Sequence, residues 1–135
     1  VRMLGPVWDQ DRLDALYSGA LTYLHGHSVG GTNPSLLRAM GAATATLAYD
    51  VSFNREVLGA DGRFWANPNA LAEQIRLAEA DPDGTIAAGV RLQERAQERY
   101  NWDDVASKYE DLAARLTSGQ SQAKKFKGKR PKANR

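Results

Sequence analysis

The sequence contains no cysteine among its 135 residues. Disulfide bonds, thiolate metal sites and cysteine nucleophiles are therefore excluded. No apolar run approaches the roughly 20 residues that a helix needs to span a bilayer, and we expect neither a membrane span nor a signal peptide. Hydrophobic residues make up 42% of the chain and charged residues 25%, a balance typical of one compact globular domain rather than a disordered chain.

The net charge of +2 hides an uneven distribution of charge. Residues 1–117 carry 11 Lys and Arg against 16 Asp and Glu, whereas residues 118–135 carry seven cations and no acid. We therefore expect a mildly acidic domain over residues 1–117 and a disordered basic tail over residues 118–135. The cations of the tail are Lys124, Lys125, Lys127, Lys129, Arg130, Lys132 and Arg135.

Strands and helices alternate in the first half of the chain. Apolar runs predict strands at residues 1–5, 21–25 and 44–49, and a further edge strand at 63–66. Apolar spacing and capping residues predict helices starting at Asp9 and spanning residues 34–42, and a loop or short helical turn at 50–58. This alternation predicts an α/β fold in which a parallel sheet is joined by right-handed crossovers, in a Rossmann-like three-layer arrangement.

Helices fill the rest of the domain. Asn67-Pro68 and Asp81-Pro82 each predict a helix start, the second helix reaching about Arg99. Asn101 caps a last helix, in which apolar residues recur every three or four positions. These residues are Trp102, Val105, Tyr109, Leu112 and Leu116.

Ligands of open parallel sheets bind at the carboxyl ends of the strands. Here those ends are residues 5–7, 25–33 and 49–54, which are polar and glycine-rich. In the loop HGHSVGGTN, Gly26, Gly30 and Gly31 let backbone amides approach a ligand. The helix that begins at Pro34 adds free N–H groups and a partial positive charge, so the loop suits a phosphate or diphosphate. The alternative is that these glycines only form a tight turn from strand to helix.

The loop matches neither the G-x-G-x-x-G fingerprint nor a phosphate-binding loop with its lysine. His25 and His27, the only histidines, lie at a strand end, where we expect their side chains to point to opposite sides. No third ligand lies nearby in the sequence, so we expect no metal site. His27 could still donate a hydrogen bond to a ligand phosphate.

A polar cluster follows the strand at 44–49. Asp50, Asn54, Arg55 and Glu56 should open into the same crevice as the glycine-rich loop. Capping of the short turn at 52–58 explains them equally well. No catalytic triad and no acid/base pair of carboxylates is recognisable.

Three stretches resemble the C-terminal, donor-binding half of GT-B glycosyltransferases of the group 1 type. The run YLHGHSVGGTNPSLLRAMGAATATLAYDVSFNREVLG is similar to the bacterial rhamnosyltransferase-type subgroup. VRMLGPVWDQDRLDALYSGA resembles the preceding strand and helix, and ERAQERYNWDDVASKYEDL resembles the closing helices. The likeness runs in order from residue 1 to about residue 116.

The resemblance implies that this half binds a nucleotide-sugar donor, such as a dTDP-, UDP- or GDP-sugar, for transfer to a polysaccharide or lipid-linked acceptor. Neither metal nor cofactor is needed, because helix dipoles and amides stabilise the leaving diphosphate. Rhamnose is one sugar that the likeness suggests. The loop Gly5, Pro6 and Val7 would lie near the base. The implied donor-binding residues are Gly26, His27, Ser28, Gly30, Gly31, Thr32, Asn33, Ser35, Arg38, Asp50, Asn54 and Glu56.

The chain departs from the family pattern in two ways. Two glutamates separated by seven residues are common in the family, and their positions fall on Gly30 and Arg38. Arg38 would meet a phosphate, suit a deoxyribose donor such as a dTDP-sugar, or be solvated, and we favour a ligand role. The acceptor-binding N-terminal domain and the first part of the donor domain have no counterpart here, so we expect an incomplete domain that is inactive in isolation. The alternative is a non-catalytic binding module.

The basic tail has two interpretations. It is either a solvated terminus or a weak contact with anionic lipid headgroups. Phe126 is its only aromatic residue, so nucleic acid is an improbable partner. We expect a cytoplasmic protein that the tail draws to the inner face of the membrane.

Overall fold

The structure, a computed structural model, describes residues 2–118. The predicted basic tail therefore lies outside the described residues, except for Ser118 at its start.

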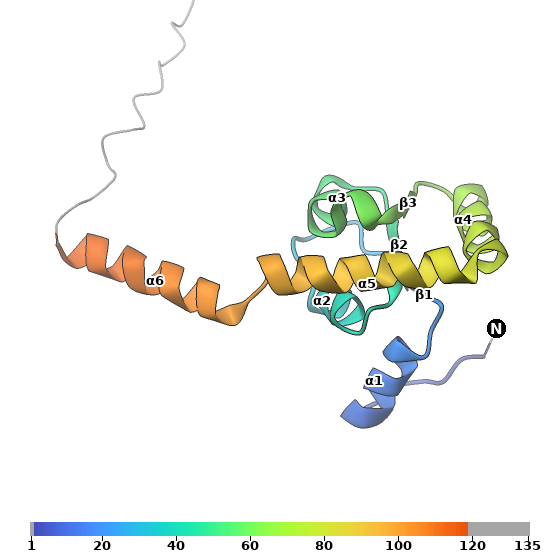
Figure 1. The fold of residues 1–135 in the computed structure, drawn as a ribbon, viewed down its shortest axis with the longest axis horizontal. Coiled ribbons are helices and arrows are strands. Elements are labelled where there is room, and N and C mark those ends of the chain that lie inside the picture. The colour runs from blue at the N-terminus through green and yellow to red at the C-terminus, as the bar shows by residue number, and fades with distance from the viewer. Residues whose placement is uncertain (1, 119–135) are drawn as a thin grey trace, which may run out of the picture. The chain divides into compact units, whose positions relative to one another are not determined.

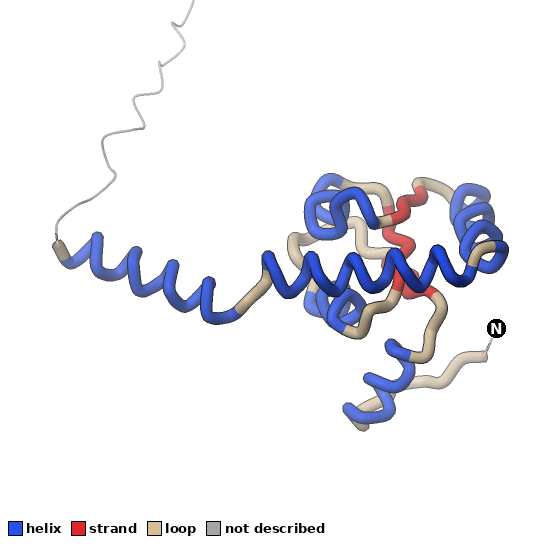
Figure 2. The backbone as a smooth tube through the Cα atoms, viewed as in Figure 1, coloured by secondary structure: helices blue, strands red, loops and turns tan. Residues whose placement is uncertain are grey.

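Helices and short parallel strands alternate up to residue 65, and helices follow (Figures 1 and 2). The elements are α1 (Gln10–Ser18), β1 (Thr22–His25), α2 (Pro34–Gly41), β2 (Ala45–Tyr49), α3 (Ser52–Leu58), the 3₁₀ turn η1 (Gly59–Asp61), β3 (Arg63–Trp65), α4 (Pro68–Ala80), α5 (Pro82–Arg99) and α6 (Trp102–Thr117). The predicted helices are confirmed, and the segment at 50–58 contains the short helix α3.

Four of the helices begin at a side chain that accepts a hydrogen bond from the first turn. Asp9, Asn33, Asn67 and Asn101 cap α1, α2, α4 and α6 in this way. In α2 and α4 a proline follows the asparagine, at a position whose N–H the helix does not need. These boundaries are local, which is why the residue pattern predicted them.

The three strands form one parallel sheet in the order β1-β2-β3. Thr22 of β1 lies opposite Ala45 of β2, and Leu47 of β2 lies opposite Arg63 of β3. The central strand β2 is buried over its first four residues, while β3 is an edge strand, as predicted. The α/β class and the parallel sheet are thus confirmed.

The predicted strand at residues 1–5 is wrong for the residues that the structure describes. Residues 2–5 form no strand, the side chain of Met3 is 88% exposed, and Gly5 has a positive φ of 67°. A strand needs a neighbour to accept and donate its backbone hydrogen bonds, and β1 pairs only with β2 within the described sheet. An apolar run alone therefore does not make a strand here.

Helix α5 lies across the end of the sheet at which the strands begin, near the carboxyl ends of α2 and α3 (Figure 1). Gln93 donates to the carbonyl of Gly41 at the end of α2 (2.7 Å), and Arg95 donates to that of Val57 in α3 (2.8 Å). A side chain at Gly89 would overlap the carbonyl oxygen of Ala43, just before β2. The carboxyl ends of the strands lie at the opposite end of the sheet. The loops that follow these ends form the candidate site.

The hydrophobic core lies between α2, β2 and α5. Its fully buried large apolar side chains come from these elements and from the end of α3. They are Leu36, Met40, Leu47, Leu58 and Leu92.

The chain divides into two compact units, Val1–Arg99 and Tyr100–Arg135. The sheet and its loops belong to the first unit, and α6 belongs to the second. Over residues 2–118, no helix is both long enough and apolar enough to cross a membrane.

Candidate functional site

The loop at residues 26–33 joins the carboxyl end of β1 to the start of α2. Residues 26–32 are all exposed. Gly30 has a φ of 117°, which disfavours any residue with a side chain. A Cβ built on Gly31 would meet no atom within 4 Å, so another molecule can approach the backbone closely at this point.

The expectation that the start of α2 adds free N–H groups is wrong, because these groups are already engaged. In the first turn of α2 the N–H of Ser35 donates to the side chain of Asn33 (2.9 Å). The N–H groups of Leu36 and Leu37 donate to the Asn33 carbonyl (3.0 and 3.1 Å). The asparagine cap therefore satisfies the helix itself, whereas the N–H groups of residues 30–33 donate to no group within the described part of the chain.

A chain of polar side chains runs behind this loop. The hydroxyl of Tyr23 donates to that of Ser35 (3.0 Å), which donates to the side-chain oxygen of Asn33 (2.7 Å). Nδ1 of His25 lies 3.4 Å from the Tyr23 hydroxyl. Tyr23 and His25 lie two residues apart on β1, so they share a face of the sheet, and together they position the start of α2.

The side chains of His25 and His27 point to the same side, so the expectation that they point to opposite sides is wrong. Their rings stack with centroids 4.6 Å apart. Residues i and i+2 of a strand share a face, and His27 retains that direction just beyond β1. Burial, aided by the charge of His27, lowers the pKa of His25. Among residues 2–118, no group of three or more ligating side chains gathers for a metal ion.

Asn54 ties the two loops at the carboxyl edge together. Its amide donates to the carbonyl of His27 (3.1 Å) and to that of Tyr49 at the end of β2 (2.9 Å), and the side chain is fully buried. Its oxygen Oδ1 and the ring nitrogen Nε2 of His25 are buried with no hydrogen-bond partner among the described residues. Asn54 is therefore a positioning residue that fixes where the loop 26–33 lies.

The other members of the polar cluster have contacts of their own, and their opening toward the loop stays a prediction. Arg55 donates two hydrogen bonds to Asp50 (2.5 and 2.6 Å), which lowers the pKa of that carboxyl. Glu56 is exposed, and its backbone carbonyl accepts a hydrogen bond from Arg95 of α5 (2.8 Å). Asp50 is thus already paired, and the backbone of Glu56 contacts the helix that covers the opposite edge of the sheet.

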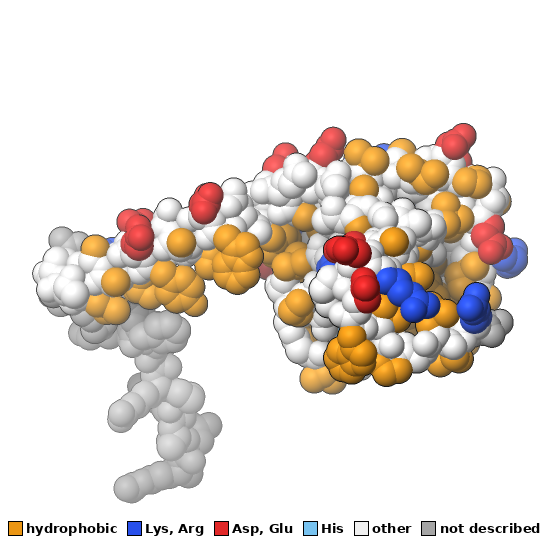
Figure 3. Space-filling model, turned by 90° about the horizontal axis from the view of Figure 1, so that it is seen from below, with side chains coloured by type: hydrophobic (Ala, Val, Ile, Leu, Met, Phe, Trp, Pro, Cys, Tyr) orange, Lys and Arg blue, Asp and Glu red, His pale blue; other side chains and the backbone are white. Residues whose placement is uncertain are grey.

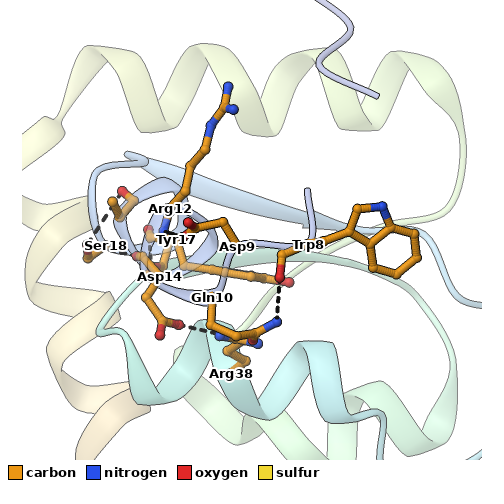
Figure 4. A network of polar contacts seen from close by, with 10 residues as sticks. Trp8, Asp9, Gln10, Arg12, Asp14, Tyr17, Ser18 and Arg38 are labelled. Atoms are coloured by element: carbon orange, nitrogen blue, oxygen red, sulfur yellow. Dashed lines mark hydrogen bonds and ion pairs between the residues drawn. The ribbon is translucent and has the colours of Figure 1, made fainter. Parts of the chain in front are cut away.

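Arg38 is paired with a residue of α1 (Figure 4). Its Nε donates to Asp14 at 2.8 Å, and its guanidinium lies 6.0 Å from the centre of the Tyr17 ring. The hydrogen bond lowers the pKa of Asp14 and raises that of Arg38. In this arrangement the guanidinium contacts α1, which the sequence analysis did not foresee, and a role for Arg38 toward a ligand stays a prediction.

Gly5, Pro6 and Val7 form no hydrogen bond with the loop 26–33 within the described residues. Gly5 and Pro6 are exposed and Val7 is half-buried. Their proximity to a nucleotide base stays a prediction.

The structure brings together the loop 26–33, Ser35 and Asn54 from the predicted set, and it adds Tyr23, which the sequence analysis missed. Tyr23 lies two residues before His25 on the same strand, so its side chain is expected on the same face of the sheet. This spacing could have identified it. Free amides, the hydroxyls of Ser28 and Thr32 and a neighbouring imidazole are suited to an anionic ligand that carries many oxygen atoms.

Neither a protein-family model nor a curated protein sequence matches this chain.

Proposed function

We propose that the loop 26–33 holds the diphosphate of a nucleotide-sugar, and that the sheet unit is the Rossmann-like, three-layer donor-binding half of a GT-B glycosyltransferase. The observation that carries the proposal is the run of N–H groups at residues 30–33, which donate to no group among residues 2–118. It lies at the carboxyl edge of a parallel sheet, where ligands of such folds bind. The run at residues 23–59 resembles the donor-binding half of GT-B glycosyltransferases, and this resemblance favours a nucleotide-sugar as the anionic ligand.

The chemistry follows from the charge of the diphosphate. Transfer of the sugar leaves negative charge on the departing phosphate, and amide donors fixed in place stabilise that charge without a metal ion. The eight-residue helix α2 begins directly behind the loop, and its dipole favours an anion there. His27, Ser28 and Thr32 supply exposed polar side chains beside the amides for the sugar and phosphates.

A further domain belongs to this proposal, because a glycosyltransferase must also hold its acceptor. The described sheet leaves one side of β1 without a neighbouring strand. A cavity of about 180 Å³ lies beside it, lined by α1 and β1 residues that include Leu13, Tyr17 and Tyr23. We expect further strands to extend the sheet beside β1. We expect an acceptor-binding domain to face the loop 26–33.

A pair of glycine substitutions tests the donor site. Both Gly31→Ala and Gly41→Ala place a methyl group where no atom lies within 4 Å, so both variants should fold. Gly31→Ala should weaken binding of dTDP, UDP or GDP by about tenfold or more, since the methyl group obstructs close approach to the backbone. Gly41→Ala, at the far end of α2, should bind as the unaltered protein does.

Isothermal titration calorimetry with each nucleotide and its sugar conjugate measures the affinities. Equal affinity of the two variants would place the ligand away from the loop. A response to no nucleotide and to no nucleotide-sugar would count against the proposal as a whole.

A non-catalytic binding module is the second candidate. The observation that favours it is the exposed apolar face of α6, whose Trp102 is 82% exposed and Tyr109 70% exposed. A module of this kind would bind a partner through α6 and leave nucleotides unbound, so the same calorimetric series separates the two candidates.

A further inference from the structure

The apolar residues of α6 form a continuous stripe along one side of the helix. Trp102, Val105, Tyr109, Leu112 and Leu116 are separated by three or four residues, which places them on one face. Trp102 is 82% exposed, Tyr109 70%, Leu112 47% and Leu116 62%. An exposed apolar surface that contains two aromatic rings and two leucines is typical of a site that binds a protein or a membrane.

The charges of α6 are arranged around the stripe in a definite order. At about 100° per residue, Lys108 and Arg115 lie on the flank of the stripe. Lys108 lines a surface hollow together with Tyr109 and Leu112. The acidic residues fall on the far side, and Figure 3 shows acidic and hydrophobic side chains on different sides of the helix. These acids are Asp103, Asp104, Glu110 and Asp111.

A second copy of α6 fits the stripe poorly. Sixteen residues provide only about two heptads, while coiled coils are recognised over at least three or four. In an antiparallel pair, Lys108 and Arg115 would face the same cations of the other copy. In a parallel pair Lys108 would face the uncharged Ala113 of the other copy, with no opposite charge to pair with.

A lipid surface fits the same features well. Trp and Tyr are favoured at the boundary between acyl chains and headgroups, because they join an apolar ring to a polar group. Basic side chains at the flank reach the headgroups while their stems cover apolar surface. The sequence that follows α6 adds seven cations and no acid between residues 118 and 135, and each such cation near an anionic surface contributes favourably.

We propose that α6 is an interfacial helix that lies in the surface of an anionic bilayer, with its stripe turned toward the acyl chains and its acidic side toward water. The basic sequence after Thr117 adds electrostatic attraction to the same surface. This inference concerns the second unit of the chain and does not depend on nucleotide-sugar binding.

Two charge-matched variants test the proposal in the 135-residue chain. Leu112→Glu places a carboxylate within the stripe, and Ala114→Glu places the same group on the opposite side of α6. Co-sedimentation with vesicles of phosphatidylcholine and phosphatidylglycerol should show binding by the unaltered protein and by Ala114→Glu. Leu112→Glu should bind about tenfold more weakly or worse, and vesicles of phosphatidylcholine alone should bind all three proteins weakly.

Bromine-labelled lipids report the depth of the stripe. They should quench the tryptophan fluorescence of the bound protein, and Trp102→Phe, which keeps an apolar ring, should still bind but lose most of the quenching. Equal sedimentation of Leu112→Glu and Ala114→Glu would overturn the proposal, as would vesicle binding without quenching by Trp102. Failure to bind vesicles, with a dimer in light scattering that Leu112→Glu abolishes, would assign the stripe to a second copy instead.

Discussion

Replacing Asn54 by alanine removes a fully buried side chain that joins the loop 26–33 to the end of β2. Both of its N–H groups are used, one on the carbonyl of His27 and one on that of Tyr49. The substitution therefore leaves two carbonyl groups without this donor, and the loop loses the side-chain hydrogen bonds that tie it to its neighbouring strand.

The cost can be estimated from these contacts. Two hydrogen bonds contribute about 1 kcal/mol each, and the small cavity adds about 1 kcal/mol. The side-chain oxygen Oδ1 has no hydrogen-bond partner in the described part of the chain, so its removal offsets about 1 kcal/mol of this loss in stability. We expect a net loss of about 2 kcal/mol in the free energy of unfolding, which corresponds to a fall of about 8 °C in Tm for a chain of this length.

Urea unfolding followed by circular dichroism measures the loss, with Asn69→Ala as the matched control. Asn69 is exposed on α4, so its replacement should change stability by no more than about 0.5 kcal/mol. Asn54→Ala should also lower the affinity for a nucleotide, because the loop is less firmly held. Equal unfolding midpoints for the two variants would refute the role given to Asn54.

Three further predictions concern other parts of the sheet unit. The pKa of His25 is lowered by burial, so its proton binds preferentially to the unfolded chain, and stability should fall as pH drops below about 6.5. His25→Gln should flatten that dependence in urea unfolding at pH 7.5 and 5.5, and an unchanged slope would contradict the assignment. Gly89→Ala should destabilise by about 3 kcal/mol or more, because the methyl group meets the backbone before β2. Gly41→Ala should be neutral within about 1 kcal/mol, and similar Tm values for the two would disprove the packing of α5. Arg38→Ala should weaken calorimetric binding of dTDP more than Asp14→Ala does, and an unchanged affinity would end the ligand role of Arg38.

Local signals predicted most of the fold. Asn33 and Asn67, each followed by proline, fixed two helix starts, because a cap and a proline act on the nearest turn only. The buried strand at 44–49 was recognisable from its continuous apolar run. The strand at 1–5 failed for a different reason: a strand depends on a partner that its own residues do not reveal.

The candidate site was predicted only in part, because its key contacts join distant residues. Asn54 lies 27 positions from His27, and Arg38 lies 24 from Asp14. The polar cluster after the strand at 44–49 identified Asn54, and the family resemblance identified Arg38, as residues of the site region. The sequence did not reveal that Asn54 positions the loop 26–33 and that Arg38 pairs with α1, because both contacts join residues far apart in the chain.

Binding of a nucleotide diphosphate by the loop 26–33 is tested most directly by following backbone amide resonances while dTDP, UDP or GDP is added. The N–H groups of residues 30–33 are free of partners within the described chain, so they should shift most and saturate together. Residues of α5, across the opposite edge of the sheet, should stay unchanged. A titration that moves the resonances of α5 or α6 and leaves those of residues 30–33 in place would contradict the account.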